Sequence, residues 1–163
     1  MKRSRKKYET PTRPWDKERL GKEKEILKNF GLKTKKEIWR AEGVLRKYRR
    51  LGRQLAAQND KEKEKELVKK LAKLGLLSES ANLDDVLGLT LEQLLERRLQ
   101  TVLFKKGLAN TPKQARQFIV HGLVSIDGRK VIFPSYFVGK EDETKILLRN
   151  IELKKTKLET SSV

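Results

Sequence analysis

The sequence predicts an α+β fold, in which an amino-terminal helical bundle precedes a small module of two helices packed on a β-hairpin or short sheet. Through the first three quarters of the chain, apolar residues recur at spacings of three and four, as on the buried face of a helix. After Gly122 the apolar spacing changes to two, which is typical of strands. These patterns divide the chain into four expected parts: a mobile basic arm (1–14), a helical domain (15–89), the helix-and-hairpin module (90–148) and a polar carboxy-terminal tail (149–163).

The charge balance points to the kind of partner. The 163 residues include 40 Lys and Arg against 22 Asp and Glu, a formal net charge of +18. Such an excess repels itself in a compact fold and favours a polyanionic partner. No apolar run approaches the roughly 20 residues that span a bilayer, and the amino terminus lacks a signal-peptide core, so we expect a cytoplasmic protein without membrane contact. With no cysteine and one histidine, we expect no disulfide and no metal site. We also expect no cofactor and no small-molecule substrate.

The arm and the helical domain follow from caps and breakers. Pro11 and Pro14 interrupt any helix in the arm. A run of basic residues of this kind is typical of a nucleic-acid-binding arm or of a localisation signal. Four helices are then expected: 15–29 with Asp16 as a possible cap, Thr34 to the Asn59-Asp60 turn with Glu37 completing a capping box, 61–74, and a short one from Asn82 to Gly88.

The longest expected helix has two distinct sides. Ile38, Ala41, Leu45, Tyr48 and Leu55 form a seam that must pack on another helix. The remaining faces carry a second set of candidate RNA-binding cations: Arg40, Arg46, Lys47, Arg49, Arg50 and Arg53. Trp39 lies off the seam, where it either contacts another helix or stacks on a base or sugar.

In the module, Thr90 and Gln93 form a capping box that starts a helix ending near Gly107. A second helix runs from Thr111 to Gly122 with Pro112 in its first turn. Strand 123–126 then enters an Asp127-Gly128 turn and returns through 131–133, with a further short strand at Tyr136 and Val138. An acidic loop, 139–144, and a last strand, 146–148, complete the module.

The polar residues of the module form a cationic surface that suits phosphate. Between residues 97 and 130 only Asp127 opposes the bases, which gives this segment a charge of +7. Thr111 and the helix it begins offer backbone N–H groups to a phosphate. His121 is a helix-end structural residue or an RNA contact, and these alternatives stay open. The candidate RNA-binding residues of the module are Arg97, Arg98, Gln100, Lys105, Thr111, Lys113, Gln114, Arg116, Gln117, His121, Arg129 and Lys130.

Two sets of residues carry a resemblance to known proteins. Arg97-Arg98-Leu99, the run 111–117, His121-Gly122, Asp127-Gly128 and Ser135-Tyr136 resemble the S-four RNA-binding module. The segments 37–42 and 45–50, together with Pro14-Trp15, are similar to the small-subunit ribosomal protein four family in its archaeal form. The second resemblance extends over essentially the full length of the chain.

The resemblance implies an αL-type RNA-binding fold and a structural, non-enzymatic role as a monomer within the small ribosomal subunit. It also implies binding to the 5′ domain of small-subunit ribosomal RNA, early action in assembly, and a place near the messenger-RNA entry channel beside small-subunit proteins three and five. Many bacterial members carry a cysteine cluster for zinc, which is absent here, so no metal is carried over.

Two alternatives remain at this stage. One is a non-ribosomal binder of structured RNA that carries the same module, and the other is a helix-turn-helix protein that binds DNA. An RNA-modifying enzyme would need a catalytic domain in addition to this module, and 163 residues leave no room for one.

Overall fold

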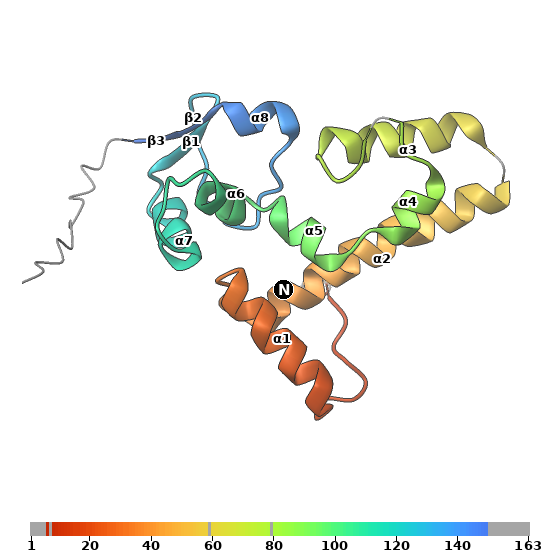
Figure 1. Cartoon of the computed structure of the whole chain (residues 1–163), viewed down its shortest axis with the longest axis horizontal. Coiled ribbons are helices and arrows are strands. Elements are labelled where there is room, and N and C mark those ends of the chain that lie inside the picture. Colours follow the sequence, from red (N-terminus) through yellow and green to blue (C-terminus); the bar gives the residue numbers. More distant parts are fainter. Residues whose placement is uncertain (1–5, 7, 59, 79, 150–163) are drawn as a thin grey trace, which may run out of the picture.

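The computed structural model describes residues 6, 8–58, 60–78 and 80–149. The elements follow one another along the chain as α1 (Lys17–Asn29), α2 (Lys35–Gln58), α3 (Lys61–Lys73), α4 (Leu83–Gly88), α5 (Leu91–Glu96), α6 (Leu99–Lys105), α7 (Pro112–Val120), β1 (Val124–Ile126), β2 (Arg129–Lys130), α8 (Lys140–Thr144) and β3 (Ile146–Leu148). The expected α+β fold, with helices first and a small sheet near the carboxyl end, is confirmed (Figure 1).

The helical domain is built around α2, its longest helix. In Figure 1, α1 projects from one end of α2, while α3 folds back over the other end. The predicted seam is confirmed, since Ile38, Ala41 and Leu45 are buried in a core with residues of α3, α4 and α5. Burial of this apolar face accounts for most of the stability of such a helix.

Two of the predicted caps stand at the starts of their helices, whereas the side chain of Glu37 accepts from the backbone N–H of Lys33 and forms no capping box with Thr34. Asp16 accepts hydrogen bonds from the backbone N–H groups of Glu18 and Arg19, and it caps α1. Thr90 and Gln93 exchange both bonds of a capping box at the start of α5. The caps of α1 and α5 are therefore confirmed, and each satisfies N–H groups that a helix leaves unpaired.

The module packs α6 and α7 against a three-stranded antiparallel sheet. The strand order is β2-β1-β3, and Val124 and Ile126 of β1 pair with Leu148 and Ile146 of β3. The Asp127-Gly128 hairpin turn is confirmed, and both of its residues have positive φ, as a tight two-residue turn requires. A second core fills the space between these helices and the sheet.

The single helix expected from Thr90 to Gly107 is wrong. It is interrupted at Arg97 and Arg98, so that α5 and α6 are separate helices. The backbone here pairs with the 136–138 segment: Leu99 N–H donates to Tyr136 at 2.8 Å, and Val138 N–H donates to Arg97 at 2.9 Å. Apolar spacing reports only the local preference for helix. Here the backbone pairing with a distant segment outweighs that preference.

Three smaller expectations in the module are corrected. The return strand β2 is Arg129–Lys130 and not 131–133, since Ile132 and Phe133 turn outward to solvent. Instead of a strand at Tyr136 and Val138, there is a single bridge between Phe137 and Arg98. The acidic segment forms the short helix α8 rather than a loop.

Some expectations fall at the ends of the chain. Residues 150–163 of the polar tail and residues 1–5 and 7 of the arm lie outside the described residues. Arg149 still donates its backbone N–H to Leu123 at 2.8 Å. None of the described helices is long and apolar enough to cross a membrane.

Candidate nucleic-acid interface

A carboxylate in the first turn of α2 joins the helical domain to the module. Glu37 accepts a hydrogen bond from the guanidinium of Arg98 at 2.8 Å and two from that of Arg116, each at 3.1 Å. Arg98 lies between α5 and α6, and Arg116 lies on α7. Because two-bond pairing of arginine with carboxylate fixes orientation, α2 and α7 are held in one defined arrangement.

The junction is largely shielded from water. The side chain of Arg98 is 5% exposed and that of Glu37 is 12% exposed. Burial by itself raises the pKa of Glu37, but the hydrogen bond and charge of Arg116, with those of Arg98, outweigh it and hold this pKa below its ordinary value. Burial lowers the pKa of Arg98, although Glu37 opposes this effect. The ion pair therefore stays charged at neutral pH.

Gln100 reinforces the same junction from α6. Its amide nitrogen lies 3.1 Å from the carbonyl oxygen of Phe30 and 2.9 Å from those of Gly31 and Pro112. Its amide oxygen accepts from Arg116 at 3.4 Å. This buried side chain thus ties the turn between α1 and α2 to the start of α7.

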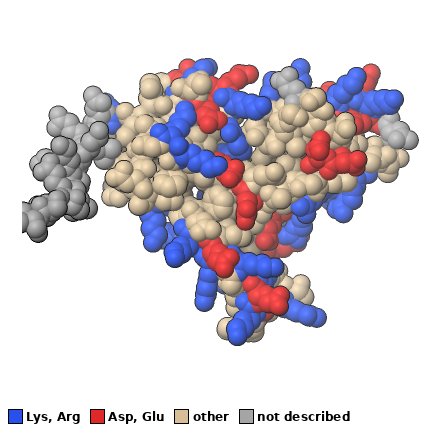
Figure 2. All heavy atoms as spheres, in the orientation of Figure 1, with Lys and Arg blue, Asp and Glu red and all other residues tan. Residues whose placement is uncertain are grey.

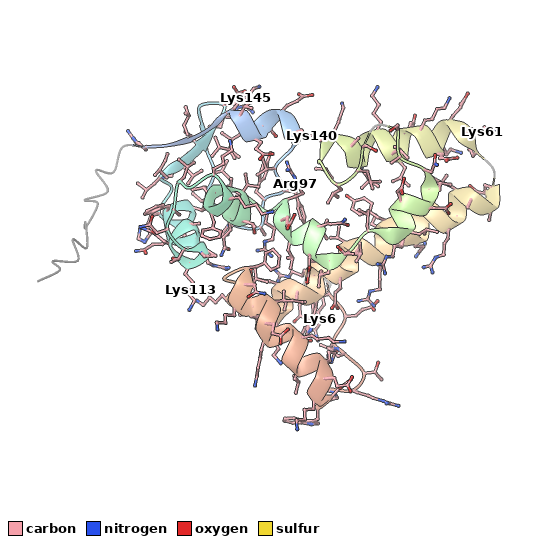
Figure 3. The ribbon with its side chains drawn as sticks, viewed as in Figure 1. Lys6, Lys61, Arg97, Lys113, Lys140 and Lys145 are labelled. Carbon is pink, nitrogen blue, oxygen red and sulfur yellow. The ribbon has the colours of Figure 1, made fainter. Side chains whose placement is uncertain are left out.

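Arg97 is also occupied within the chain. Its guanidinium donates to Glu143 of α8 at 3.0 Å and to the carbonyl oxygen of Val138 at 2.9 Å (Figure 3). The contacts of Arg97, Arg98 and Gln100 therefore give these three residues a structural role. Arg116 keeps a quarter of its side chain exposed while paired with Glu37, so it stays accessible at the surface.

The outer face of α7 presents a row of polar side chains. Lys113, Gln117 and His121 are spaced four residues apart and are all exposed, so they share one face of the helix. Figure 3 shows Lys113 at the start of α7, near the turn between α1 and α2. Lys130 of the hairpin packs closely over Gly122, which places it at the other end of this row.

Four other predicted residues of the module have more local roles. Thr111 caps α7 by accepting from the backbone N–H of Gln114 at 3.2 Å. The side chain of Gln114 accepts from the backbone N–H of Asn110 at 2.8 Å. Lys105 is exposed and pairs with Glu96 at 3.1 Å, and Arg129 is exposed on β2.

The cations of α2 divide into two groups. Arg40, Lys47 and Arg50 are exposed, and their spacings of seven and three residues place them on one face. Arg53 is exposed as well. Arg49 instead donates to the carbonyl oxygen of Leu89 at 2.6 Å, in a half-buried position that supports the helical domain.

Tyr8 and Glu9 of the arm contact α2. The ring of Tyr8 lies 5.9 Å from that of Trp39, and the guanidinium of Arg40 lies 5.8 Å from the Tyr8 ring centroid. Glu9 pairs with Arg46. Trp39 donates to Glu23 of α1 at 3.0 Å, so the expected helix contact of Trp39 is confirmed.

A groove runs between α2 and the loop that follows the hairpin. It has a volume of about 660 Å³, and its walls include Lys33, Lys36 and Arg40 on one side and Arg116 and Ser135 on the other. A second hollow shares Arg40 and Val44 with it and continues along α2 past Lys47 and Arg50. We call these two hollows together the basic groove. Figure 2 shows that Lys and Arg side chains gather beneath the module and along α1 and α2, with acidic side chains between them.

The sequence did not single out several residues of this region. Lys33 and Lys36 line the basic groove, and Lys36 could have been found by following the exposed face of α2 back from Arg40. Glu37 and Glu23 were not predicted as buried ion partners, because their partners lie on other elements. Among the described residues, no group of three or more His, Cys, Asp or Glu side chains could hold a metal ion.

Comparisons with known proteins agree with these features. The family model described as the S4 domain matches residues 97–143, and that described as the ribosomal protein S4/S9 N-terminal domain matches residues 2–96. The protein named small ribosomal subunit protein uS4 of Nanoarchaeum equitans is 53% identical over 151 residues, covering 90% of this chain and 84% of its own length. The protein of the same name from Saccharolobus islandicus (strain L.S.2.15 / Lassen #1) is 51% identical over 149 residues, covering 89% and 82%.

Proposed function

Because this chain belongs to the ribosomal protein S4 family, a structural and non-enzymatic family of the small ribosomal subunit, we propose that it binds small-subunit ribosomal RNA along the basic groove and the outer face of α7. Its location is the small ribosomal subunit in the cytoplasm. No bond is made or broken in this role, so its chemistry is recognition of the RNA backbone.

The proposed surface reads shape and phosphate rather than base sequence. A-form RNA has a deep, narrow major groove that side chains cannot read, so phosphates and 2′-hydroxyls are what a fixed protein surface contacts. Cations that neutralise phosphates release counterions, which supplies most of the affinity. The proposed contacts on these two surfaces are Lys33, Lys36, Arg40, Lys47, Arg50, Lys113, Arg116, Gln117, His121 and Lys130. Arg53, Lys105 and Arg129 are also exposed, and we propose them as further phosphate contacts.

One observation carries the proposal: a buried junction holds cations of both halves around a single groove. Glu37 and Gln100 fix α2, α6 and α7 relative to one another, so Arg40 and Arg116 face the same groove although they lie on different elements. Preorganisation of this kind lowers the entropic cost of binding.

The finer placement rests on the family resemblance. We propose that the RNA is the 5′ domain of small-subunit ribosomal RNA, that binding occurs early in subunit assembly, and that the chain lies near the messenger-RNA entry channel. Small-subunit proteins three and five are its proposed neighbours.

Filter binding to a transcript of the 5′ domain, repeated over a series of salt concentrations, tests the proposal. We expect Lys36→Ala and Arg40→Ala to weaken binding and each to lower the salt slope by about 0.7–0.9, since each removes one phosphate contact. Lys65→Ala and Lys69→Ala on α3 are matched controls, because they remove exposed cations from a helix outside the basic groove.

Competition with duplex DNA at fixed salt separates this function from helix-turn-helix recognition. We expect the transcript to displace the chain from DNA. Preference for the duplex, or equal losses in the α3 controls and the groove variants, would contradict the proposed RNA surface.

A further inference from the structure

Trp15 is the most exposed large apolar side chain among the described residues, at 89% of its surface. It lies just before α1, and the amino-terminal part of that helix projects from the body of the molecule (Figure 1). A single exposed apolar side chain is ordinary on a protein surface. The backbone that carries Trp15 differs from an ordinary surface segment, because the side chains of Asp16 and Arg19 hold it in place.

The segment around Trp15 is fixed from both sides. The guanidinium of Arg19 donates to the carbonyl oxygen of Arg13 at 2.8 Å and to that of Pro14 at 3.1 Å. Asp16 accepts from the backbone N–H groups of Glu18 at 3.2 Å and Arg19 at 3.4 Å. These hydrogen bonds restrain the backbone at Trp15, so a partner that binds there orders little further backbone.

The helix beneath this turn is itself anchored. Glu23 of α1 is buried, accepts a hydrogen bond from Trp39 at 3.0 Å and forms a salt bridge with Lys35 at 3.1 Å, and both partners lie on α2. At 1.5 Å per residue, the 13 residues of α1 hold Trp15 about 20 Å from the turn that leads into the basic groove. Trp15 is thus a separate contact point at a fixed distance from that groove.

The surroundings of Trp15 suit a nucleotide. Residues 12–16 line a shallow open hollow beside the ring, and Arg13 and Lys17 lie exposed next to it. The carboxylate of Asp16 is already committed to the cap of α1. An aromatic face with cations beside it matches a base with its phosphates, since every base offers a π-face and every nucleotide a negative charge.

We propose that Trp15 stacks on an unpaired base of the RNA that this chain binds, in a loop or bulge about 20 Å from the basic groove. This inference rests on the proposed function and names one class of contact within it. Thr12 and Arg13 line the same hollow, so we expect them to lie beside the sugar and phosphate of that nucleotide.

The test is RNA affinity of Trp15→Ala and Trp15→Phe over a series of salt concentrations, with the 5′-domain transcript as ligand. We expect Trp15→Ala to lose about 5- to 150-fold in affinity with an unchanged salt slope, because it removes stacking and no phosphate contact. Trp15→Phe keeps an aromatic ring and should lose less. Leu147→Ala, which removes another exposed apolar side chain (62% exposed), is the matched control and should bind as the wild type does.

Fluorescence supplies a second measurement. The difference between the wild-type spectrum and that of Trp15→Phe isolates the emission of Trp15 from that of Trp39. We expect the transcript to quench this difference signal, because a stacked base quenches an indole ring. The melting temperature of free Trp15→Ala should match that of the wild type, since the ring packs little of its surface on the protein.

The outcomes separate this inference from the proposed function. Wild-type binding with no loss in Trp15→Ala would overturn the stacking contact and leave the basic groove intact. Unchanged RNA affinity combined with poorer incorporation into reconstituted subunits would identify a protein partner for Trp15 and also overturn it. Failure of the wild-type chain to bind the transcript would overturn both.

Discussion

Glu37 and Glu23 are carboxylates with little exposure in a strongly cationic chain, and each joins separate elements. Glu37 links α2 to Arg98 and Arg116 of the module, and Glu23 links α1 to Lys35 and Trp39 of α2. A buried charge is costly unless it is paired and hydrogen-bonded. These two side chains therefore determine where the cations around them are held.

We expect Glu37→Gln to destabilise the chain by about 3 kcal/mol, because it leaves the buried guanidinium of Arg98 without its charge partner. The stability difference between the wild type and Glu37→Gln should depend on pH. Since the folded-state pKa of Glu37 lies below its ordinary 4.5, the ion pair stabilises the fold above that pH, and this contribution is lost as pH falls through the folded pKa. Urea unfolding at several pH values between 7 and 3 measures both effects.

A matched control for Glu37→Gln is a carboxylate that has no buried arginine partner. Glu25→Gln changes an exposed side chain of α1, so it should alter the free energy of unfolding by less than about 0.5 kcal/mol. The wild type and Glu37→Gln should converge in stability at the acid end of the series. If the free energies of unfolding of the two proteins ran parallel over the whole pH range, Glu37 would not contribute to the loss of stability in acid.

At the scale of single residues, the sequence located the cations but not their partners. It counted Arg97, Arg98 and Arg116 as one cationic surface because Asp127 is the one acid between residues 97 and 130. Their carboxylate partners lie far away along the chain: Arg98 and Arg116 bond to Glu37 across 61 and 79 positions, and Arg97 bonds to Glu143 across 46. Such pairs arise from tertiary packing, which apolar spacing and charge counts do not report.

At the scale of elements, local rules predicted most boundaries. Caps such as Asp16 and Thr90, and the Asp127-Gly128 turn, act over a few residues and are readable in sequence. Sequence patterns missed the break between α5 and α6, because that break depends on pairing of Arg98 with the 136–138 segment. They also missed the shortness of β2. Elements whose limits depend on distant backbone were the ones that sequence could not place.

The turn between α1 and α2 gives a test at this scale. Gly31 has a φ of +59°, and a Cβ built there would lie 2.7 Å from Cβ of Pro112 at the start of α7. Gly107 has a φ of +70° with nothing within 4 Å of the same position. We expect Gly107→Ala to cost about 1–2 kcal/mol from backbone strain and Gly31→Ala to cost about 1–3 kcal/mol more from overpacking.

Urea unfolding of the two glycine variants measures this difference directly, because Gly107→Ala isolates the backbone contribution. A cost for Gly31→Ala no larger than that for Gly107→Ala would contradict the close approach of the α1–α2 turn to α7. It would also weaken the case that the helical domain and the module form one rigid surface.

At the scale of the whole molecule, the question is whether the two halves bind RNA as one surface. A formal net charge of +18 supplies attraction wherever the cations lie, so charge alone does not require a fixed arrangement. The junction at Glu37 and Gln100 does impose a fixed arrangement, because it aligns the groove walls contributed by α2 and by the module. Rigidity should therefore affect affinity separately from charge.

Gln100→Leu separates the two effects, because it keeps the side-chain volume and removes no cation. The buried carbonyl groups of Phe30, Gly31 and Pro112 lose their donor, which should lower the free energy of unfolding by about 1–3 kcal/mol. We expect weaker binding to the 5′-domain transcript with an unchanged salt slope, whereas Lys36→Ala lowers that slope. If Gln100→Leu lowered the slope by as much as Lys36→Ala does, the side chain would be acting on the phosphate contacts themselves. If it left affinity unchanged, the two halves would bind RNA independently of the junction that joins them.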